Sequence, residues 1–233
     1  MSLPVAILAG GLATRLRPIT EAIPKALVEI AGRPFAEYQI DWLQSQGTSH
    51  VVFLVGYRGE MIRDALGDGR ARGMNVDYVF DGPQLLGTGG ALRRALHVLG
   101  PAFVVMYGDS YLRCDLPAIV RTFEQAGRSG LMTVLHNDNR WDRSNVLFER
   151  GHLLAYDKHG PTPDMRHIDY GLGVLKGSAL TRYPADRAFD LADVYRDLLA
   201  AGDLIGYEVS ERFYEIGSPE GLAEARAWFE SRA

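Results

Sequence analysis

The sequence predicts an α/β protein with a doubly wound, mostly parallel sheet, and three observations support this. Short apolar runs alternate with amphipathic segments along the 233 residues. Each run is nearly all apolar, as strands buried on both faces of a parallel sheet should be. No repeat, low-complexity tract or Ser/Gly-rich linker divides the chain. Strand–helix alternation in one uninterrupted segment therefore favours a single domain covering residues 1–233.

The expected elements follow from these patterns. Strands are predicted at Val5–Ala9, Val51–Val55, Val76–Phe80, Phe103–Tyr107, Leu131–Leu135 and Leu172–Leu175. Helices are predicted at Phe35–Gln46, Gly90–Leu99, Leu116–Ala126, Leu191–Ala201 and Pro219–Phe229. The last helix has clear start chemistry, with Ser218 as N-cap and Pro219 at the first helical position. The segment His159–Met165, which contains two prolines, is expected to be a surface loop.

Composition excludes several classes of protein. Hydrophobic residues make up 47% and charged residues 23% of the chain, which is typical of a globular protein. The net charge of −4 offers no surplus of basic residues for nucleic-acid binding. No apolar run is long enough for a membrane span, and the N-terminus has no basic region typical of a signal peptide. The single cysteine, Cys114, excludes an internal disulfide. A cytoplasmic protein is therefore expected.

The segment after the first predicted strand has the features of a phosphate site. In an open parallel sheet, ligands bind beyond the carboxyl ends of the strands. Gly10 and Gly11 stand there, and glycines let backbone N–H groups approach an anion closely. Arg15, Arg17 and Lys25 follow, and these are the side chains that bind phosphate oxygens.

Two other phosphate loops do not fit this segment. It lacks the third glycine of the G-x-G-x-x-G pattern, and it has no Gly-Lys-Ser/Thr ending. A Rossmann oxidoreductase and a Walker-type NTPase are therefore disfavoured.

Residues 10–18, GGLATRLRP, and residues 24–28, PKALV, resemble the opening pattern of the sugar-phosphate nucleotidyltransferases. The chain is most similar to the short, single-domain type that acts on mannose 1-phosphate or heptose 1-phosphate with GTP. Ala13 stands where the family pattern has glycine. The resemblance covers nearly the whole chain. It implies transfer of a nucleoside monophosphate from an NTP to a sugar 1-phosphate, with release of pyrophosphate.

The resemblance assigns the nucleotide side of the site. Residues 86–91, LGTGGA, resemble the family loop that lies against the base, although Gln84 and Leu85 replace the usual Glu-Pro before it. Arg15 and Lys25 are implied as catalytic residues. The implied nucleotide-binding residues are Leu8, Ala9, Gly10, Gly11, Thr14, Gln84, Gly87, Thr88 and Gly89.

A magnesium site is expected from two carboxylates. Asp109 follows an apolar strand in the tripeptide Gly-Asp-Ser, and hard carboxylate oxygens suit Mg²⁺. It matches the family's metal-binding aspartate. Glu215, in residues 215–219 (EIGSP), stands where the family has its second metal-binding aspartate. The resemblance therefore implies Mg²⁺ as cofactor, held by Asp109 and Glu215.

The sugar side departs most from the family pattern. Lys158 follows Asp157 where the family has Glu-Lys, and Asp169 replaces the usual asparagine. The implied sugar-phosphate-binding residues are Asn145, Lys158, Asp169 and Gly171. No general base is expected, because the sugar phosphate is already ionised and the six histidines form no catalytic motif.

GTP with a heptose or mannose 1-phosphate is the favoured substrate pair, and three alternatives remain. The first is a CTP-dependent cytidylyltransferase for a phosphoalcohol such as phosphocholine, with Tyr111, Trp141 and Tyr170 available as an aromatic cage. The second is a UTP-dependent amino-sugar 1-phosphate uridylyltransferase. The third is a non-catalytic subunit that binds a nucleotide sugar. The sequence contains no hexapeptide repeat, the pattern that would predict a C-terminal β-helix. It also gives no indication of an oligomeric state.

Overall fold

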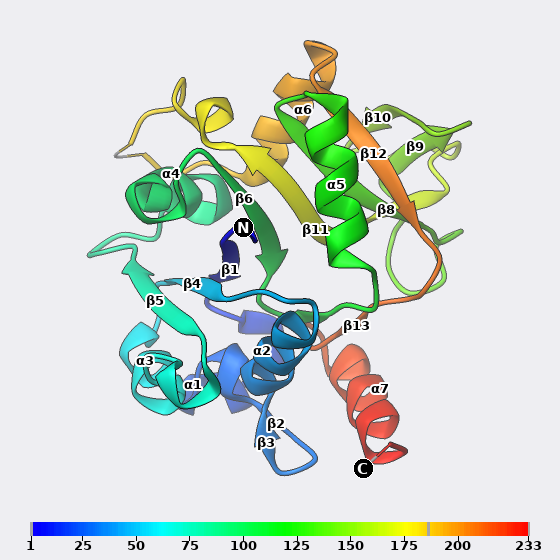
Figure 1. Cartoon of the computed structure of the whole chain (residues 1–233). Coiled ribbons are helices and arrows are strands. Elements are labelled where there is room, and N and C mark those ends of the chain that lie inside the picture. The colour runs from blue at the N-terminus through cyan, green and yellow to red at the C-terminus, as the bar shows by residue number, and fades with distance from the viewer. Residues whose placement is uncertain (1, 186, 233) are drawn as a thin grey trace.

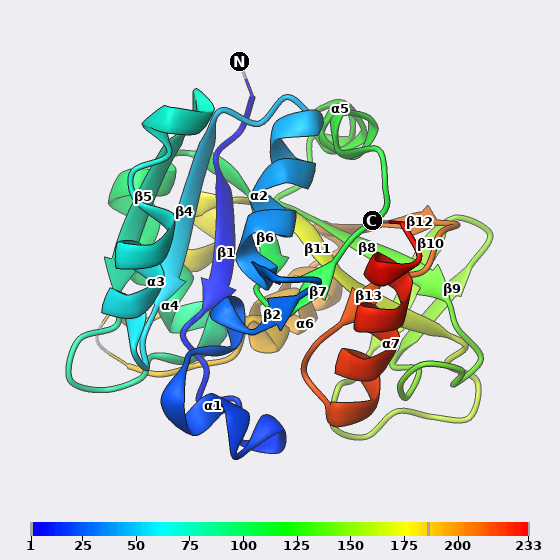
Figure 2. The ribbon, with the colours of Figure 1, turned by 90° about the horizontal axis from the view of Figure 1, so that it is seen from below.

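The computed structural model describes residues 2–185 and 187–232, and within them it contains a nine-stranded mixed sheet with helices on both faces (Figure 1). Seven of these strands run in the order β10-β9-β11-β6-β1-β4-β5. The other two extend the sheet from β11, since β8 pairs with β11 and β12 pairs with β8. Figure 2 shows β5, β4, β1, β6 and β11 side by side in this order.

The sheet strands are β1 (Val5–Ala9), β4 (His50–Val55), β5 (Asn75–Phe80), β6 (Ala102–Tyr107), β8 (Gly130–His136), β9 (Val146–Glu149), β10 (His152–Tyr156), β11 (His167–Lys176) and β12 (Leu204–Val209). Two short pairs join β2 (Glu29–Ile30) to β3 (Arg33–Pro34) and β7 (Ser110–Tyr111) to β13 (Tyr214–Glu215). The α-helices are α1 (Ile19–Ala22), α2 (Phe35–Ser45), α3 (Gly59–Leu66), α4 (Gly87–Leu99), α5 (Leu116–Ala126), α6 (Leu191–Ala200) and α7 (Pro219–Glu230). Short 3₁₀ turns cover Thr14–Leu16, Lys25–Leu27, Arg70–Arg72 and Gly177–Leu180.

The predicted doubly wound sheet is confirmed, and its two halves differ in strand direction. Strand β1 is parallel to β4 and β6, and β4 is parallel to β5. Strand β11 is antiparallel to β6 and β8. The six predicted strands and five predicted helices are all present, with ends shifted by a few residues or fewer for all but the last strand. That strand, predicted as Leu172–Leu175, is ten residues long.

Strands β9, β10 and β12 and helix α3 were not predicted from the sequence. Strand β10 alternates buried and exposed residues, and β12 contains Gly206 and Glu208. A half-exposed strand has no continuous apolar run, so the pattern used to find buried strands misses it. The loop predicted at His159–Met165 is confirmed, since it contains no helix or strand.

Alternate residues of the central strands enter two separate cores. Val5 and Ile7 pack in one core with α2, α3 and α5, whereas Ala6 packs in the other with α4 and α6. In β4, Phe53 packs in the first of these cores and Leu54 in the second. This period of two places apolar residues on both faces of each strand, which explains their nearly continuous apolar sequences.

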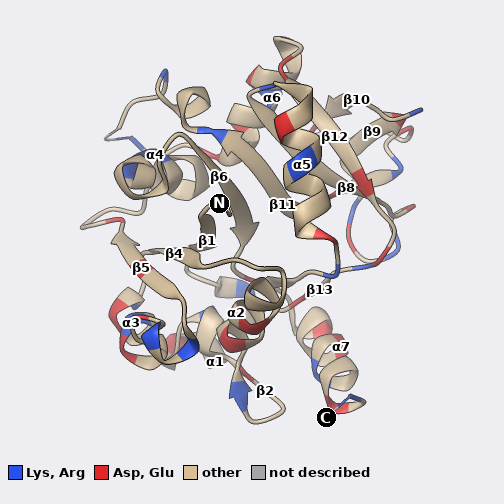
Figure 3. Ribbon diagram, viewed as in Figure 1, with Lys and Arg blue, Asp and Glu red and all other residues tan. Residues whose placement is uncertain are grey.

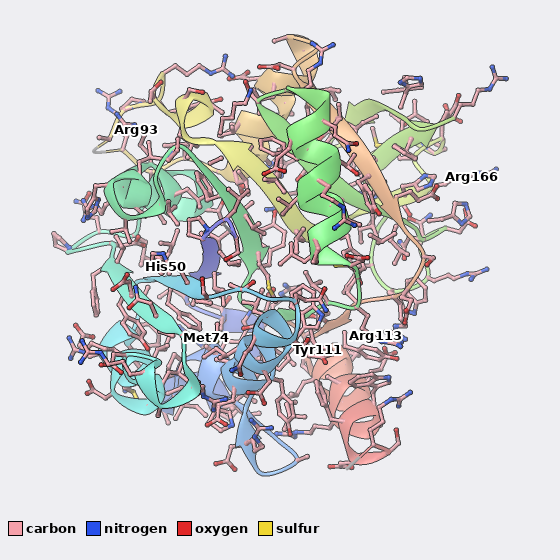
Figure 4. The ribbon with its side chains drawn as sticks, viewed as in Figure 1. His50, Met74, Arg93, Tyr111, Arg113 and Arg166 are labelled. Atoms are coloured by element: carbon pink, nitrogen blue, oxygen red, sulfur yellow. The ribbon has the colours of Figure 1, made fainter. Side chains whose placement is uncertain are left out.

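A third core fixes the C-terminal helix against the N-terminal third of the chain. Leu222 and Phe229 of α7 pack with Leu16, Ile30 and Phe35. The predicted cap is confirmed, because the Ser218 hydroxyl accepts the Gly221 N–H at 3.0 Å. Tyr111 and Arg113, labelled in Figure 4, face α7, where their side chains contact the Trp228 ring. Residues about 200 positions apart in sequence therefore meet beside the sheet.

The parallel strands end at one edge. Figure 2 shows α1 beyond the end toward which β1 points. Acidic and basic residues are scattered over many elements, as Figure 3 shows. Within the described residues, no helix has both the length and the apolar character needed to cross a membrane.

Replacement of the α5 cap tests the local basis of this fold. Asp115 is exposed, and its carboxylate accepts the Ala118 N–H at 2.9 Å. Asp115→Ala should lower the free energy of unfolding by about 1 kcal/mol, because one helix N–H loses its partner. Urea unfolding followed by circular dichroism measures this change. Asp115→Asn keeps the acceptor and should be nearly neutral, and equal losses in both variants would contradict the capping role.

Candidate functional site

A cavity of about 610 Å³ opens at the carboxyl ends of the central parallel strands. This volume lies in the range of small-molecule sites. Most of the residues predicted for the site line it, from both the nucleotide and the sugar sides. These are Leu8, Ala9, Gly10, Gly11, Arg15, Lys25, Gly87, Thr88, Asp109, Asn145, Lys158, Asp169 and Glu215.

Four predicted residues lie outside the cavity wall. Thr14 and Gln84 are exposed to solvent. Gly89 is buried, and a Cβ there would lie 2.3 Å from the Phe189 ring, so this glycine allows α4 to pack closely. Gly171 has a φ of +89° and faces the Tyr107 ring. The two glycines therefore serve backbone packing, and none of the four residues is among those that line the cavity.

The loop after β1 depends on close backbone packing. The Gly108 N–H donates to the Leu8 carbonyl at 3.0 Å, and a Cβ at Gly108 would lie 2.5 Å from that oxygen. Only glycine allows the turn after β6 to lie so close to β1. Ala13 has a φ of +48°, in the left-handed region that glycine favours. This conformation explains why the family pattern has glycine at that position.

The catalytic candidate Lys25 and the metal candidate Asp109 form an ion pair inside the cavity. Lys25 Nζ donates to Asp109 Oδ2 at 2.9 Å, and the two side chains are 20% and 29% exposed. Arg15 and Glu215 lie next to this pair. A Cβ on Gly217 would lie 2.7 Å from Glu215 Oε2, 3.0 Å from Asp109 Oδ2 and 3.2 Å from Arg15 Nη2. Two cations and two carboxylates therefore converge on one small volume.

The short β7–β13 pair brings the two carboxylates together. Glu215 is in register with Ser110, the residue after Asp109, and the Ile216 N–H donates to the Asp109 carbonyl at 2.8 Å. Gln39 holds the same turn from beneath the sheet edge. Its fully buried amide donates to the Tyr107 carbonyl at 3.2 Å and the Ser110 carbonyl at 2.8 Å. Gln39 therefore fixes the backbone on both sides of Asp109.

The donor set fits a magnesium ion held jointly by protein and substrate. Among residues 2–185 and 187–232, no cluster of three or more His, Cys, Asp or Glu side chains is placed to hold a metal. Asp109 and Glu215 provide two carboxylates beside Arg15 and Lys25. Mg²⁺ is typically bound by one or two carboxylates, with water and substrate phosphate oxygens as its other ligands. The pair meets this requirement and forms no closed, all-protein metal cage.

The sugar side contains a partly buried carboxylate in a hydrogen-bond network. Asp169 Oδ2 accepts the hydroxyls of Tyr107 at 3.2 Å and Tyr156 at 3.4 Å, and Oδ1 accepts the Gly171 N–H at 3.0 Å. The Asp169 N–H donates to Asn145 Oδ1 at 3.0 Å. Burial raises the pKa of Asp169, although these hydrogen bonds act in the opposite direction.

Asp190 links the sugar side to the nucleotide loop, and sequence reasoning did not identify it. Its Oδ2 accepts Lys158 Nζ at 3.2 Å, and its Oδ1 accepts the Thr88 hydroxyl at 2.9 Å. Although burial opposes this, the Ala192 N–H and the Lys158 charge lower the pKa of Asp190. Asp190 directly precedes the helix predicted to begin at Leu191, and this N-cap position is the sequence feature that could have identified it.

Other cavity residues also lay outside the predicted set. Asp81, Leu85 and Arg143 line the wall together with the tyrosines of the Asp169 network. Asp81 directly follows a predicted strand, which is the same signal that identified Asp109. The aromatic residues considered for a quaternary-ammonium cage do not line this cavity. Tyr170 is buried beside Phe213, and Trp141 stacks on Arg212.

The open α/β sheet carries a glycine loop, paired cations and paired carboxylates at the carboxyl ends of its strands. This arrangement is typical of proteins that bind phosphorylated ligands. The nucleotidyl transferase family profile matches residues 5–144, from β1 to the segment just before β9. The chain belongs to this nucleotidyltransferase family.

Relatives of known name support the same assignment. A D-glycero-alpha-D-manno-heptose 1-phosphate guanylyltransferase of Campylobacter jejuni is 32% identical, with 92% of this chain and 94% of that protein covered. A mannose-1-phosphate guanylyltransferase of Mycobacterium tuberculosis is 28% identical over 95% of this chain. The chain spans only 63% of the length of that second relative.

Solved structures share the fold. A putative glucose-1-phosphate thymidylyltransferase from Bacillus anthracis superposes with a TM-score of 0.87 at 20% identity, covering 97% of this chain and 95% of that one. HddC from Yersinia pseudotuberculosis, complexed with GMP-PN, gives a TM-score of 0.81 at 25% identity, covering 98% and 100% of the two chains.

Titration of Asp169 gives a testable effect on stability. Because its pKa is raised in the folded protein, the native state holds this proton more tightly than the unfolded chain. The contribution of Asp169 to stability therefore falls as pH rises through the raised pKa. Asp169→Asn cannot ionise, so its stability relative to wild type should increase from about pH 4 to pH 7. Urea unfolding at several pH values measures this difference.

Asp203→Asn serves as a control of opposite sign. Hydrogen bonds from Ser129 lower the pKa of Asp203, so its ionised form contributes stability that is present above the ordinary Asp pKa and lost in acid. This variant should lose stability relative to wild type as pH rises. A parallel response of the two variants would contradict the assigned burial effect at Asp169.

Proposed function

We propose that this protein transfers a nucleoside monophosphate from a nucleoside triphosphate to a sugar 1-phosphate, forming a nucleoside diphosphate sugar and pyrophosphate. The observation that carries this proposal is the convergence of Arg15, Lys25, Asp109 and Glu215 in one cavity. Family membership supports the class of reaction.

The reaction brings two polyanions together, so charge neutralisation and alignment are the main tasks of the site. A phosphate oxygen of the sugar phosphate attacks the α-phosphorus, and the bond from that phosphorus to the bridging oxygen of the pyrophosphate breaks. The nucleophile is already ionised, and no side chain has to remove a proton. Arg15 and the Gly10–Gly11 backbone hold the triphosphate, and Arg15 stabilises the departing pyrophosphate.

Lys25 and Lys158 divide the remaining charge between the two substrates. Lys25 lies against Asp109 and neutralises the transferring phosphoryl group, whereas Lys158 attracts the sugar phosphate from its ion pair with Asp190. Asp109 and Glu215 are the residues that would hold Mg²⁺, which would polarise the α-phosphate when bound.

GTP and a heptose or mannose 1-phosphate are the proposed substrates. Two relatives that each cover more than 90% of this chain are named as guanylyltransferases for these two sugars. The cavity wall also contains polar groups suited to sugar hydroxyls, among them Asp169 and Asn145. Tyr111, Trp141 and Tyr170, the aromatic residues considered for a phosphocholine-type substrate, do not line this wall.

A substrate matrix tests the proposal. Pyrophosphate release is measured with GTP, UTP, CTP and ATP against mannose, heptose, N-acetylglucosamine and N-acetylmuramate 1-phosphates and phosphocholine, with Mg²⁺ and with EDTA. Release should be fastest for GTP with heptose or mannose 1-phosphate and should require Mg²⁺. If no pair released pyrophosphate, the proposed reaction would be wrong, and a preference for phosphocholine would replace it with the cytidylyltransferase alternative.

The roles of the two cations predict a large kinetic effect. Arg15→Ala and Lys25→Ala should each lower kcat by about 10²–10³, the scale seen when one preorganised electrostatic group is removed. Arg17→Ala is the matched control, because Arg17, which the sequence grouped with Arg15 and Lys25, is exposed and does not line the cavity. Its rate should equal that of wild type. A wild-type rate in the Arg15 variant would rule out its assigned role.

A further inference from the structure

Glu215 is longer by one methylene group than the aspartate that the family pattern has at this position. It ends β13, and α7 begins shortly afterwards at Pro219 (Figure 2). The extra length of the side chain has to be taken up within this short connection if the carboxylate is to lie beside Asp109. The residues that accommodate it all lie at the start of α7.

The Glu215 side chain folds back onto the start of this helix. Its Oε2 accepts the Gly217 N–H, and its Oε1 accepts the Ser218 hydroxyl. A Cβ on Gly217 would lie 2.7 Å from Glu215 Oε2 and 3.0 Å from Asp109 Oδ2, so the two carboxylates face the same space. The folded-back conformation therefore fixes both oxygens of Glu215 and leaves its carboxylate beside that of Asp109.

Gly221 provides the space for this conformation. A Cβ at position 221 would overlap Glu215 Oε1 and Cδ, and it would also lie 2.8 Å from the Glu215 carbonyl oxygen. Real Cβ atoms essentially never approach other heavy atoms so closely. Any residue other than glycine at position 221 therefore has to displace Glu215.

The backbone of Gly221 gives no other reason for a glycine. The residue lies in the first turn of α7, and its φ is not positive. Glycine is one of the least favourable residues in a helix, because it loses the most backbone freedom on folding. The Gly221 N–H donates to the Ser218 hydroxyl at 3.0 Å, a bond that any residue except proline could make. Contact with Glu215 is thus the feature that requires glycine here.

We propose that Gly221 is a positioning residue for Glu215 and that the two residues form a matched pair. Glycine at position 221 lets a glutamate present its carboxylate beside Asp109, in the place of the family's aspartate. The inference rests on the proposed function for the metal role of Glu215, whereas the steric match depends only on contacts between the two residues. An alanine at position 221 should displace Glu215, and an aspartate at position 215 should reduce the need for glycine.

Thermal unfolding in EDTA tests the steric match without metal or substrate. Ala223, an exposed residue of the same helix, supplies the control, and Ala223→Gly should lower Tm by about 2–4 °C, the ordinary effect of glycine in a helix. At position 221 the order should be reversed, so that Gly221→Ala also lowers Tm. In the Glu215→Asp background only the carbonyl contact remains, and Gly221→Ala should lower Tm by less than half as much.

Pyrophosphate release tests the link to the reaction, with the pair from the substrate matrix that wild type turns over fastest. Gly221→Ala should raise the Mg²⁺ concentration for half-maximal rate about 10–100-fold, the scale seen when a group that orients a metal ligand is lost. The double variant Glu215→Asp/Gly221→Ala should recover most of this loss, although it carries two substitutions. Ala223→Gly should leave the Mg²⁺ requirement unchanged.

The outcomes separate this inference from the proposed function. If Gly221→Ala raised Tm, as alanine normally does in a helix, or kept the wild-type Mg²⁺ requirement, Gly221 would not position Glu215. A double variant as impaired as Gly221→Ala would overturn the inference in the same way, and nucleotidyl transfer would stand in each case. If wild type released pyrophosphate from no substrate pair, the proposed function would be wrong, and the unfolding cycle would still decide the steric match.

Discussion

The ion pair between Lys25 and Asp109 is the interaction around which the site is organised. It joins the chain after the first strand to the turn after β6, and both side chains are largely removed from water. In such a setting each charge requires a partner, because desolvation without pairing costs several kcal/mol. Glu215 and Arg15 extend the pair into a group of alternating charge. An arriving polyanion would meet cations already held in place, with little reorganisation left for the reaction itself.

Helix α7 places the last member of this group. Its apolar face is buried against the segment that contains Leu16 and Phe35, and its first turn follows directly from Glu215. The helix cap and the metal candidate share the Ser218 hydroxyl, which donates to Glu215 and accepts the Gly221 N–H. Packing of the C-terminal helix and the geometry of the carboxylates are therefore coupled. Gln39 adds hydrogen bonds to the Tyr107 and Ser110 carbonyls, on either side of Asp109.

The parts of the fold that sequence reasoning identified share one physical property. Buried strands such as β1 and β4 are apolar on both faces, and amphipathic helices such as α5 carry their own caps, so their signals are local. Strands β9, β10 and β12 are half exposed, and their pairing decides that they are strands at all. The same division applies to the site. Asp109 was identified by its motif, whereas Asp190 matters through Thr88 and Lys158, which are distant from it in sequence.

The sequence by itself determined the strand–helix alternation, the glycine loop with its basic residues, and the acidic turn after β6, because each depends on contiguous residues. Only the tertiary structure decided that Glu215 lies beside Asp109, that Lys158 is paired with Asp190, and that Gln84, Thr14, Gly89 and Gly171 lie off the cavity wall. Distances between side chains on different elements are set by how the two sheet faces and α7 pack, and no local pattern encodes that packing.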